Sequence, residues 1–191
     1  MRPSHNSRQL GASLLEVLVA ILILSFGMLA LSGMLAFAVQ MPKLAAYRAT
    51  ATALAASHIE RMRANPQGFR VGAYAETLSY NNGTVLAAPQ TVSSLCLYPN
   101  CAPDTIATRD KYETNYALQK QLTPTAGMRV TCTAGTCTDL DGDIWIIWLE
   151  PTTFASLDSG TSDECPDATV APTFAAFVAP KPRCLHVRFK L

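Results

Sequence analysis

The hydrophobic residues of this chain are concentrated near its N-terminus. An uncharged run extends from Val17 to Val39 and counts 23 residues. At about 1.5 Å per residue, a helix of this length measures roughly 34 Å, against about 30 Å for the apolar core of a bilayer. The run therefore predicts a transmembrane helix. A single carboxylate, that of Glu16, stands immediately before it.

A helical pattern of apolar residues continues beyond this run. These residues recur at spacings of three and four as far as Met62, which predicts an amphipathic extension of the same helix. The members of this stripe are Leu44, Tyr47, Ala51, Leu54, Ala55, His58, Ile59 and Met62. The first helix is thus expected to have an apolar half and an amphipathic half.

Two prolines mark the middle and the end of this helix. Pro42 removes one backbone donor, so a kink or an unwound turn is expected at residues 40–43, with a plain break between two helices as the alternative. At the far end stands Asn65-Pro66. Because the residue before a proline avoids helical backbone angles, the helix is predicted to end near Ala64.

Later in the chain the pattern changes to one typical of β-strands. Residues 128–132 and 185–191 alternate between apolar and polar side chains, and residues 144–149 form a β-branched and aromatic run. Three strands are predicted there. Residues 108–122 contain no glycine or proline and show a helical pattern, which predicts a short helix before the first of these strands.

A hairpin completes the predicted elements. Residues 77–80 and 84–86 flank Asn81-Asn82-Gly83, a sequence that favours a tight turn because Asn and Gly tolerate positive φ. The fold class expected is α+β, in which the second half of a long N-terminal helix packs on an antiparallel sheet of about four strands. This arrangement would bury the helical stripe and the apolar face of the sheet together.

The ten residues before Gly11 do not have the layout of a secretory signal. They include Arg2 and Arg8, but no apolar segment precedes the small residue, and the apolar run follows it instead. A peptidase that cuts after Gly11 would remove a basic leader and leave the helix on the mature chain. The new amino group would then be on Ala12, one helical turn from Glu16.

The segment from Gly11 to Leu35 resembles the class III signal of type IV prepilins. In that family a membrane-embedded peptidase cleaves after glycine and methylates the new N-terminus, and the apolar helix is kept for filament assembly. The residue after the cut is usually phenylalanine, and here it is Ala12. The resemblance implies that Glu16 attracts the N-terminus of the neighbouring subunit and sets its stagger. The alternative is that Glu16 is a solvated residue in the headgroup layer.

Residues 59–69 also resemble the helix ending of the minor pilins called PilV. This resemblance implies a structural subunit and not an enzyme, which helps initiate type IV pilus assembly and twitching motility from a position at or near the pilus tip. Its domains would be a leader at 1–11, a transmembrane and assembly helix at 12–40 and a periplasmic head at 41–191. Before assembly it would span the inner membrane of a Gram-negative bacterium once, and afterwards it would be part of the extracellular pilus.

The partners implied are the prepilin peptidase, inner membrane lipid, other minor pilins and the major pilin, with a large tip adhesin as a further one.

Close approach of neighbouring helices is favoured by a stripe of small residues. They are Gly27, Ala30, Gly33 and Ala36.

The formal net charge is +1, and removing Arg2 and Arg8 would leave 13 basic and 14 acidic residues. Nucleic acid is therefore not an expected partner.

Two other functions remain open at this stage. A minor pseudopilin of a type II secretion system would carry a similar signal, but the cysteine-rich C-terminal half and the PilV-like helix end favour a pilus. A tip adhesin or DNA-uptake pilin should expose a basic or aromatic cluster. The long segment 151–182 contains only Lys181 as a base and three phenylalanines.

The chain has six cysteines, all of which follow Glu60 and thus fall in the part expected outside the cytoplasm. An oxidising compartment favours disulfides. Spacing suggests the pairs Cys96–Cys101, Cys132–Cys137 and Cys165–Cys184. The alternative is a zinc site formed by the first two pairs.

No residues with an evident catalytic or cofactor-binding role stand out, and neither a cofactor nor a resident metal is expected. Three histidines, His5, His58 and His186, have no metal-ligand spacing. Four carboxylates, Asp139, Asp141, Asp143 and Glu150, suggest a calcium loop, but Ile144 stands where that motif needs glycine.

Two tryptophans, Trp145 and Trp148, fall on opposite faces of one predicted strand. One is expected in the core and the other near the surface or under a loop. An exposed indole would mark a partner-binding patch, and a plain packing role for both is the alternative.

Overall fold

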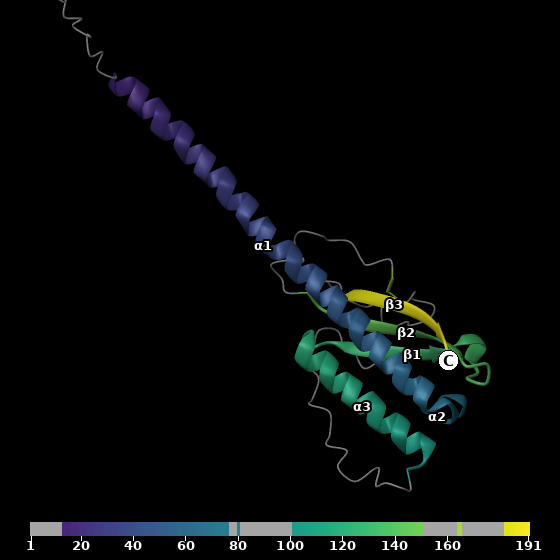
Figure 1. Ribbon diagram of the computed structural model, residues 1–191. Helices are drawn as coiled ribbons and strands as arrows, with labels where there is room; N and C mark the ends of the chain where they lie inside the picture. The colour runs from purple at the N-terminus through teal and green to yellow at the C-terminus, as the bar shows by residue number, and fades with distance from the viewer. Residues whose placement is uncertain (1–12, 77–79, 81–100, 151–163, 166–181) are drawn as a thin grey trace, which may run out of the picture. The chain divides into compact units, whose positions relative to one another are not determined.

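The computed structural model describes residues 13–76, 80, 101–150, 164–165 and 182–191. The chain divides into two compact units, Met1–Leu44 and Ala45–Leu191. Helix α1 spans Leu14–Ala64 and contributes residues to both units. Figure 1 shows α1 together with the elements of the second unit.

The helical assignment of α1 continues through Pro42. A kink or an unwound turn was expected at residues 40–43, with a break between two helices as the alternative. The unwound turn and the break are wrong, and the kink stays a prediction. A proline inside a helix removes a single backbone donor, and the uninterrupted turns on either side keep their own hydrogen bonds.

The end of α1 is at Ala64, as the sequence predicts. Asn65 then starts the short helix α2, Pro66–Arg70, and its side-chain oxygen accepts a hydrogen bond from the Gly68 N–H at 3.2 Å. Pro66 stands in the first turn of α2, where its missing N–H would have had no helical partner. One Asn-Pro pair therefore ends one helix and begins the next.

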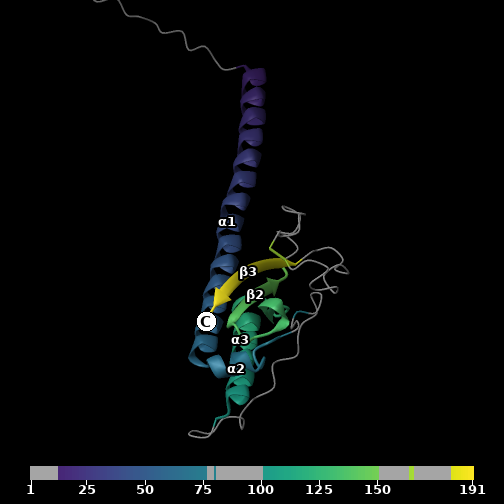
Figure 2. The same ribbon diagram turned by 90° about the vertical axis from the view of Figure 1, so that its right-hand side faces the viewer.

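The second unit contains α3, Pro103–Gln121, and three strands, β1 at Gly127–Cys132, β2 at Asp141–Trp148 and β3 at Arg183–Lys190. A 3-10 turn, η1, covers Thr133–Gly135 between β1 and β2. The strands form an antiparallel sheet in the order β1-β2-β3 (Figure 1). Figure 2 shows β2 and β3 side by side from a second direction.

The α+β fold class and the three predicted strands are confirmed, with changed limits. The helix α3 begins five residues before the predicted start at 108, because Pro103 is compatible with a first helical turn. An isolated antiparallel bridge joins Glu76 to Val130 beside β1. The hairpin predicted at residues 77–86 lies outside the described residues except for Tyr80, so the described part of the sheet has three strands.

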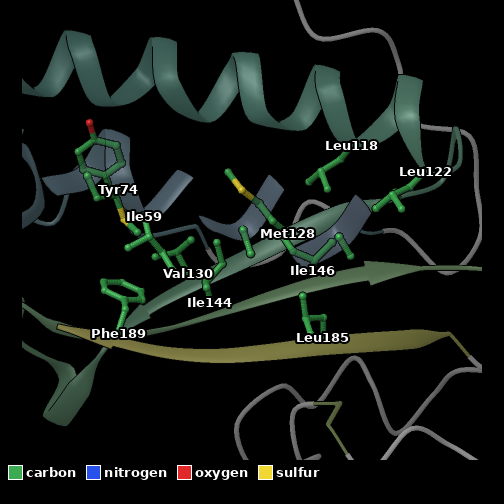
Figure 3. Close-up of a cluster of buried hydrophobic side chains, with 14 of the residues drawn as sticks. Ile59, Tyr74, Leu118, Leu122, Met128, Val130, Ile144, Ile146, Leu185 and Phe189 are labelled. Atoms are coloured by element: carbon green, nitrogen blue, oxygen red, sulfur yellow. The ribbon is translucent and has the colours of Figure 1, made fainter. Parts of the chain in front are cut away.

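The main core lies between the helices and one face of the sheet (Figure 3). In this view Leu118 of α3 and Leu122, which directly follows α3, point toward Met128 and Ile146 of the sheet. All eight residues of the predicted α1 stripe are buried or partly buried, and Ala51, Ala55, Ile59 and Met62 belong to this core. The amphipathic extension of the first helix is thereby confirmed.

The opposite face of the sheet has a smaller cluster containing Trp145, Ile147 and Cys184 together with Tyr80. Trp148 belongs to the main core, so the two indoles do lie on opposite faces. Both are buried, at 8% exposure for Trp145 and 4% for Trp148. The plain packing role applies, and no exposed indole is available for a partner-binding patch.

Candidate functional site

In the first unit α1 is an apolar helix whose large side chains are exposed, from 46% for Val17 to 85% for Leu14. By length and composition α1 can cross a membrane. Its hydroxyl groups are satisfied within the helix, since Ser25 donates to the Ile21 carbonyl at 2.7 Å and Ser32 to the Met28 carbonyl at 2.9 Å. A segment in hydrocarbon needs this internal satisfaction because lipid tails offer no partners.

The first turn of α1 brings Ser13 and Glu16 together. The Ser13 hydroxyl oxygen accepts a hydrogen bond from the Glu16 N–H at 3.2 Å, as an N-cap does. The sequence analysis missed this cap, although a serine three residues before a glutamate is a known signature of a helix start. The positive end of the helix dipole favours a carboxylate at this position.

The Glu16 side chain is exposed, and it forms no ion pair with a cation in the described part of the chain. The residues expected at the cleavage point, Gly11 and Ala12, lie outside the described residues. Cleavage and methylation therefore stay predictions.

The stripe of small residues lies on exposed helix surface. A Cβ built at Gly27 or at Gly33 would have no other atom within 4 Å. Nothing in the described part of this chain therefore requires glycine at these positions.

Two disulfides are present among the described residues. Cys132 is bonded to Cys137, with their Cα atoms 4.9 Å apart, across η1. This bond leaves neither thiolate free for the alternative zinc site. Cys101 is disulfide-bonded as well, and Cys96, the partner predicted for it, lies outside the described residues.

The second disulfide, Cys165–Cys184, attaches a segment of the chain to β3 with a Cα separation of 4.9 Å. The neighbouring Glu164 forms an ion pair with Arg48 of α1, and its second oxygen accepts from the His186 N–H at 3.4 Å. A covalent bond and a carboxylate thus hold this point of the chain against both α1 and β3.

Three of the four carboxylates of the rejected calcium loop lie beside basic residues of β3. Asp143 lies 2.9 Å from His186, Asp141 lies 3.5 Å from Lys190, and Glu150 lies 3.3 Å from Arg183. No three metal-ligating side chains converge within the described residues. His186 also stacks on the Trp145 ring, at 4.7 Å between centroids.

Polar side chains connect the end of α1 to α3, and we name this region the α1–α3 joint: His58, Arg61, Asn65, Tyr74, Asp110, Glu113 and Thr114. The Arg61 guanidinium contacts both carboxylates, at 3.2 Å from Asp110. The Tyr74 hydroxyl donates to Asp110, and the Asn65 amide donates to the Pro103 carbonyl at 2.7 Å. Burial, followed by the hydrogen bond to Asp110, raises the pKa of Tyr74, so the phenol remains a donor near neutral pH.

Replacing Tyr74 by phenylalanine should lower the free energy of unfolding by about 2 kcal/mol, because the Asp110 carboxylate loses a buried donor. The measurement is the denaturation midpoint of the chain in detergent. Tyr116→Phe is the matched control, since Tyr116 lies on the outer face of α3 at 44% exposure. Equal effects of the two substitutions would contradict the role assigned to Tyr74.

Comparison with known proteins identifies one feature. Residues 6–32 match the family model described as the prokaryotic N-terminal methylation motif. The search of curated proteins found no match, and neither did the search of solved structures. The matched motif is the class III signal of type IV pilin-like proteins, so it supports membrane anchoring, processing by a prepilin peptidase and assembly with other pilins. It covers residues 6–11 of the predicted leader and the first part of α1, including Glu16.

Proposed function

We propose that this chain is a minor pilin, a structural subunit that helps initiate type IV pilus assembly together with other minor pilins. Removal of residues 1–11 would leave Ala12 as the methylated N-terminus. Residues 12–40 would anchor the subunit in the inner membrane, and residues 41–191 would form its periplasmic head. After assembly the subunit would lie at or near the tip of the extracellular pilus of a Gram-negative bacterium.

The observation that carries this proposal is the methylation motif on a helix that exposes its apolar side chains along the span that follows Glu16. An apolar helix of this length is stable in lipid or inside a bundle of similar helices. The folded second unit at its other end has the α+β architecture expected of a pilin head.

The proposed assembly step is the docking of Glu16 on the N-terminal amine of a neighbouring subunit. Opposite charges attract strongly in an apolar bundle, and either charge alone is costly there. The pair therefore acts as a register device, which sets how far one subunit rises past the next. The small residues at Gly27, Ala30, Gly33 and Ala36 would allow the two helices to approach closely.

The pilus is favoured over a secretion pseudopilus by two features of the head. One is the helix end at Ala64 followed by Asn65-Pro66, which is PilV-like, and the other is the disulfides that cross-link the sheet region. A chromosomal deletion separates the two functions. Loss of twitching motility with normal enzyme secretion supports the pilus, and the reverse result supports the minor pseudopilin.

Mass spectrometry of the mature chain tests the processing step. The expected result is an N-terminus at Ala12 with one added methyl group, and bridged peptides for Cys132–Cys137 and Cys165–Cys184 in a non-reducing digest. A Gly11→Val variant should retain its leader and serve as the unprocessed control. A wild-type chain that keeps its first eleven residues and is recovered without lipid would refute the proposal.

A further inference from the structure

An imidazole is buried between α1 and α3. His58 of α1 has 0% exposure, and its Nδ1 lies 2.8 Å from the Thr114 hydroxyl of α3. That hydroxyl donates its single hydrogen to the Asp110 carbonyl at 2.8 Å. It must therefore accept from His58, which places the proton of the neutral imidazole on Nδ1.

The other ring nitrogen, Nε2, is buried and has no hydrogen-bond partner within the described part of the structure. In the neutral ring it carries only a lone pair. Protonation would convert it into a buried donor without an acceptor and would place a full positive charge in the interface. Both changes are unfavourable in an apolar environment.

The charges nearest to the ring oppose protonation as well. Burial, and then the cations of Arg61 on α1 and Lys111 on α3, lower the pKa of His58 to about 4. Two acids of α3 that face the end of α1 already have a cationic partner, since Asp110 and Glu113 both contact Arg61.

The remaining neighbours that the structure describes supply no unpaired carboxylate that would favour a protonated His58 ring. The Glu76 carboxylate is already paired, because the Lys111 ammonium lies 3.6 Å from it. The Tyr74 ring meets His58 edge-on, with 5.8 Å between centroids, and its hydroxyl is directed to Asp110. In the described residues, then, each acid that faces this region is already paired with a base.

The attachment of α3 near His58 is mainly polar. The buried residues of α3 are Ala107, Thr114 and Leu118. Between Ala107 and Leu118, the helix contributes the polar residues Asp110 and Thr114 to the joint. The sheet, by contrast, buries larger apolar side chains on β1 and β2. A charge introduced at His58 would therefore weaken the α3 contact before it weakened the sheet.

We propose that the α1–α3 joint is an acid-sensitive contact, in which a proton from solvent adds to Nε2 of His58 and releases α3 from α1. The inference does not depend on the proposed assembly function. The sign follows from proton linkage: because folding lowers the pKa of His58, its neutral ring stabilises the joint above about pH 6.5. That contribution is lost as the pH falls from about 6.5 to about 4.

Hydrogen exchange of the full-length mature chain in detergent micelles tests the release. On lowering the pH from about 7 to about 5, opening of α3 should become roughly 30-fold more frequent after correction for intrinsic exchange, with much smaller changes in β1 and β2. His58→Asn and His58→Leu should both abolish this pH dependence. In His58→Asn the amide occupies the place of Nδ1. The control His186→Gln should preserve the dependence. Equal pH dependence in wild type and both His58 variants would overturn the proposal.

A second measurement does not require any variant to fold. Nuclear magnetic resonance of the full-length chain labelled at histidine should show the Nδ1–H tautomer for His58 and a titration midpoint well below its ordinary pKa of 6.5. A midpoint near that ordinary value, or an Nε2–H tautomer at neutral pH, would overturn the proposal even if the exchange data were ambiguous.

Discussion

Replacing Glu16 by alanine should leave membrane insertion and leader removal intact but nearly abolish incorporation into pili. In the proposed filament this carboxylate pairs with a neighbouring N-terminal amine inside an apolar bundle. Removing one partner of a buried pair leaves the other uncompensated, at a cost of roughly 3 kcal/mol or more, which corresponds to at least about a 100-fold loss of incorporation. The measurement is the amount of subunit in sheared filaments relative to the amount in membranes.

Glu60→Ala is the matched control for this experiment. Glu60 is an exposed glutamate of the same helix, with a side chain that is 65% exposed and that pairs, among the described residues, only with Arg63. Its removal should change the recovered amount little, because surface ion pairs contribute little energy. Normal recovery of Glu16→Ala would refute the register role. Failure of that variant to insert or to lose its leader would place Glu16 in processing instead.

Replacing Gly142 by alanine should lower the free energy of unfolding of the second unit by about 3 kcal/mol. Gly142 lies on β2 directly opposite Phe189 of β3. A Cβ at this position would stand 2.7 Å from the Phe189 ring and 2.7 Å from the Thr131 carbonyl oxygen, which is backbone. The Phe189 ring cannot move freely, because Phe69 meets it edge-on at 5.6 Å between centroids.

Gly33→Ala is the matched control, since the same methyl group placed on α1 meets no atom within 4 Å. Thermal or chemical unfolding in detergent should show a large shift for Gly142→Ala and none in the second unit for Gly33→Ala. If Gly142→Ala had wild-type stability, the tight packing of Phe189 over β2 would be wrong.

The features that the sequence predicted well depend on neighbouring residues. Asn65-Pro66 ends α1 at Ala64 because proline restricts the backbone before it, whatever packs nearby. In β3, Leu185 and Phe189 are buried while His186 and Arg188 are exposed, as alternation requires. At Pro42 the predicted unwound turn does not occur, because the rest of the helix was sufficient to continue through one missing donor.

Contacts between distant segments could not be anticipated in the same way. His58 was only a member of a stripe. Its tautomer is set by Thr114 of α3, and its lowered pKa comes from burial and then from the cations of Arg61 and Lys111. Tyr74 gave no signal at all, although its hydroxyl joins the end of α1 to Asp110. Such pairings depend on how helices are placed in space, which spacing along the chain does not encode.

By itself, then, the sequence determined an apolar run long enough to span a membrane, the acid that precedes it, the end of the first helix and the faces of the strands. Each of these follows from covalent geometry or from hydrophobic periodicity over a few residues. The tertiary structure alone decided that Gly142 must lack a side chain, that both tryptophans are buried, and that an uncharged imidazole lies in the contact between α1 and α3. These depend on close packing between residues that are far apart in the chain.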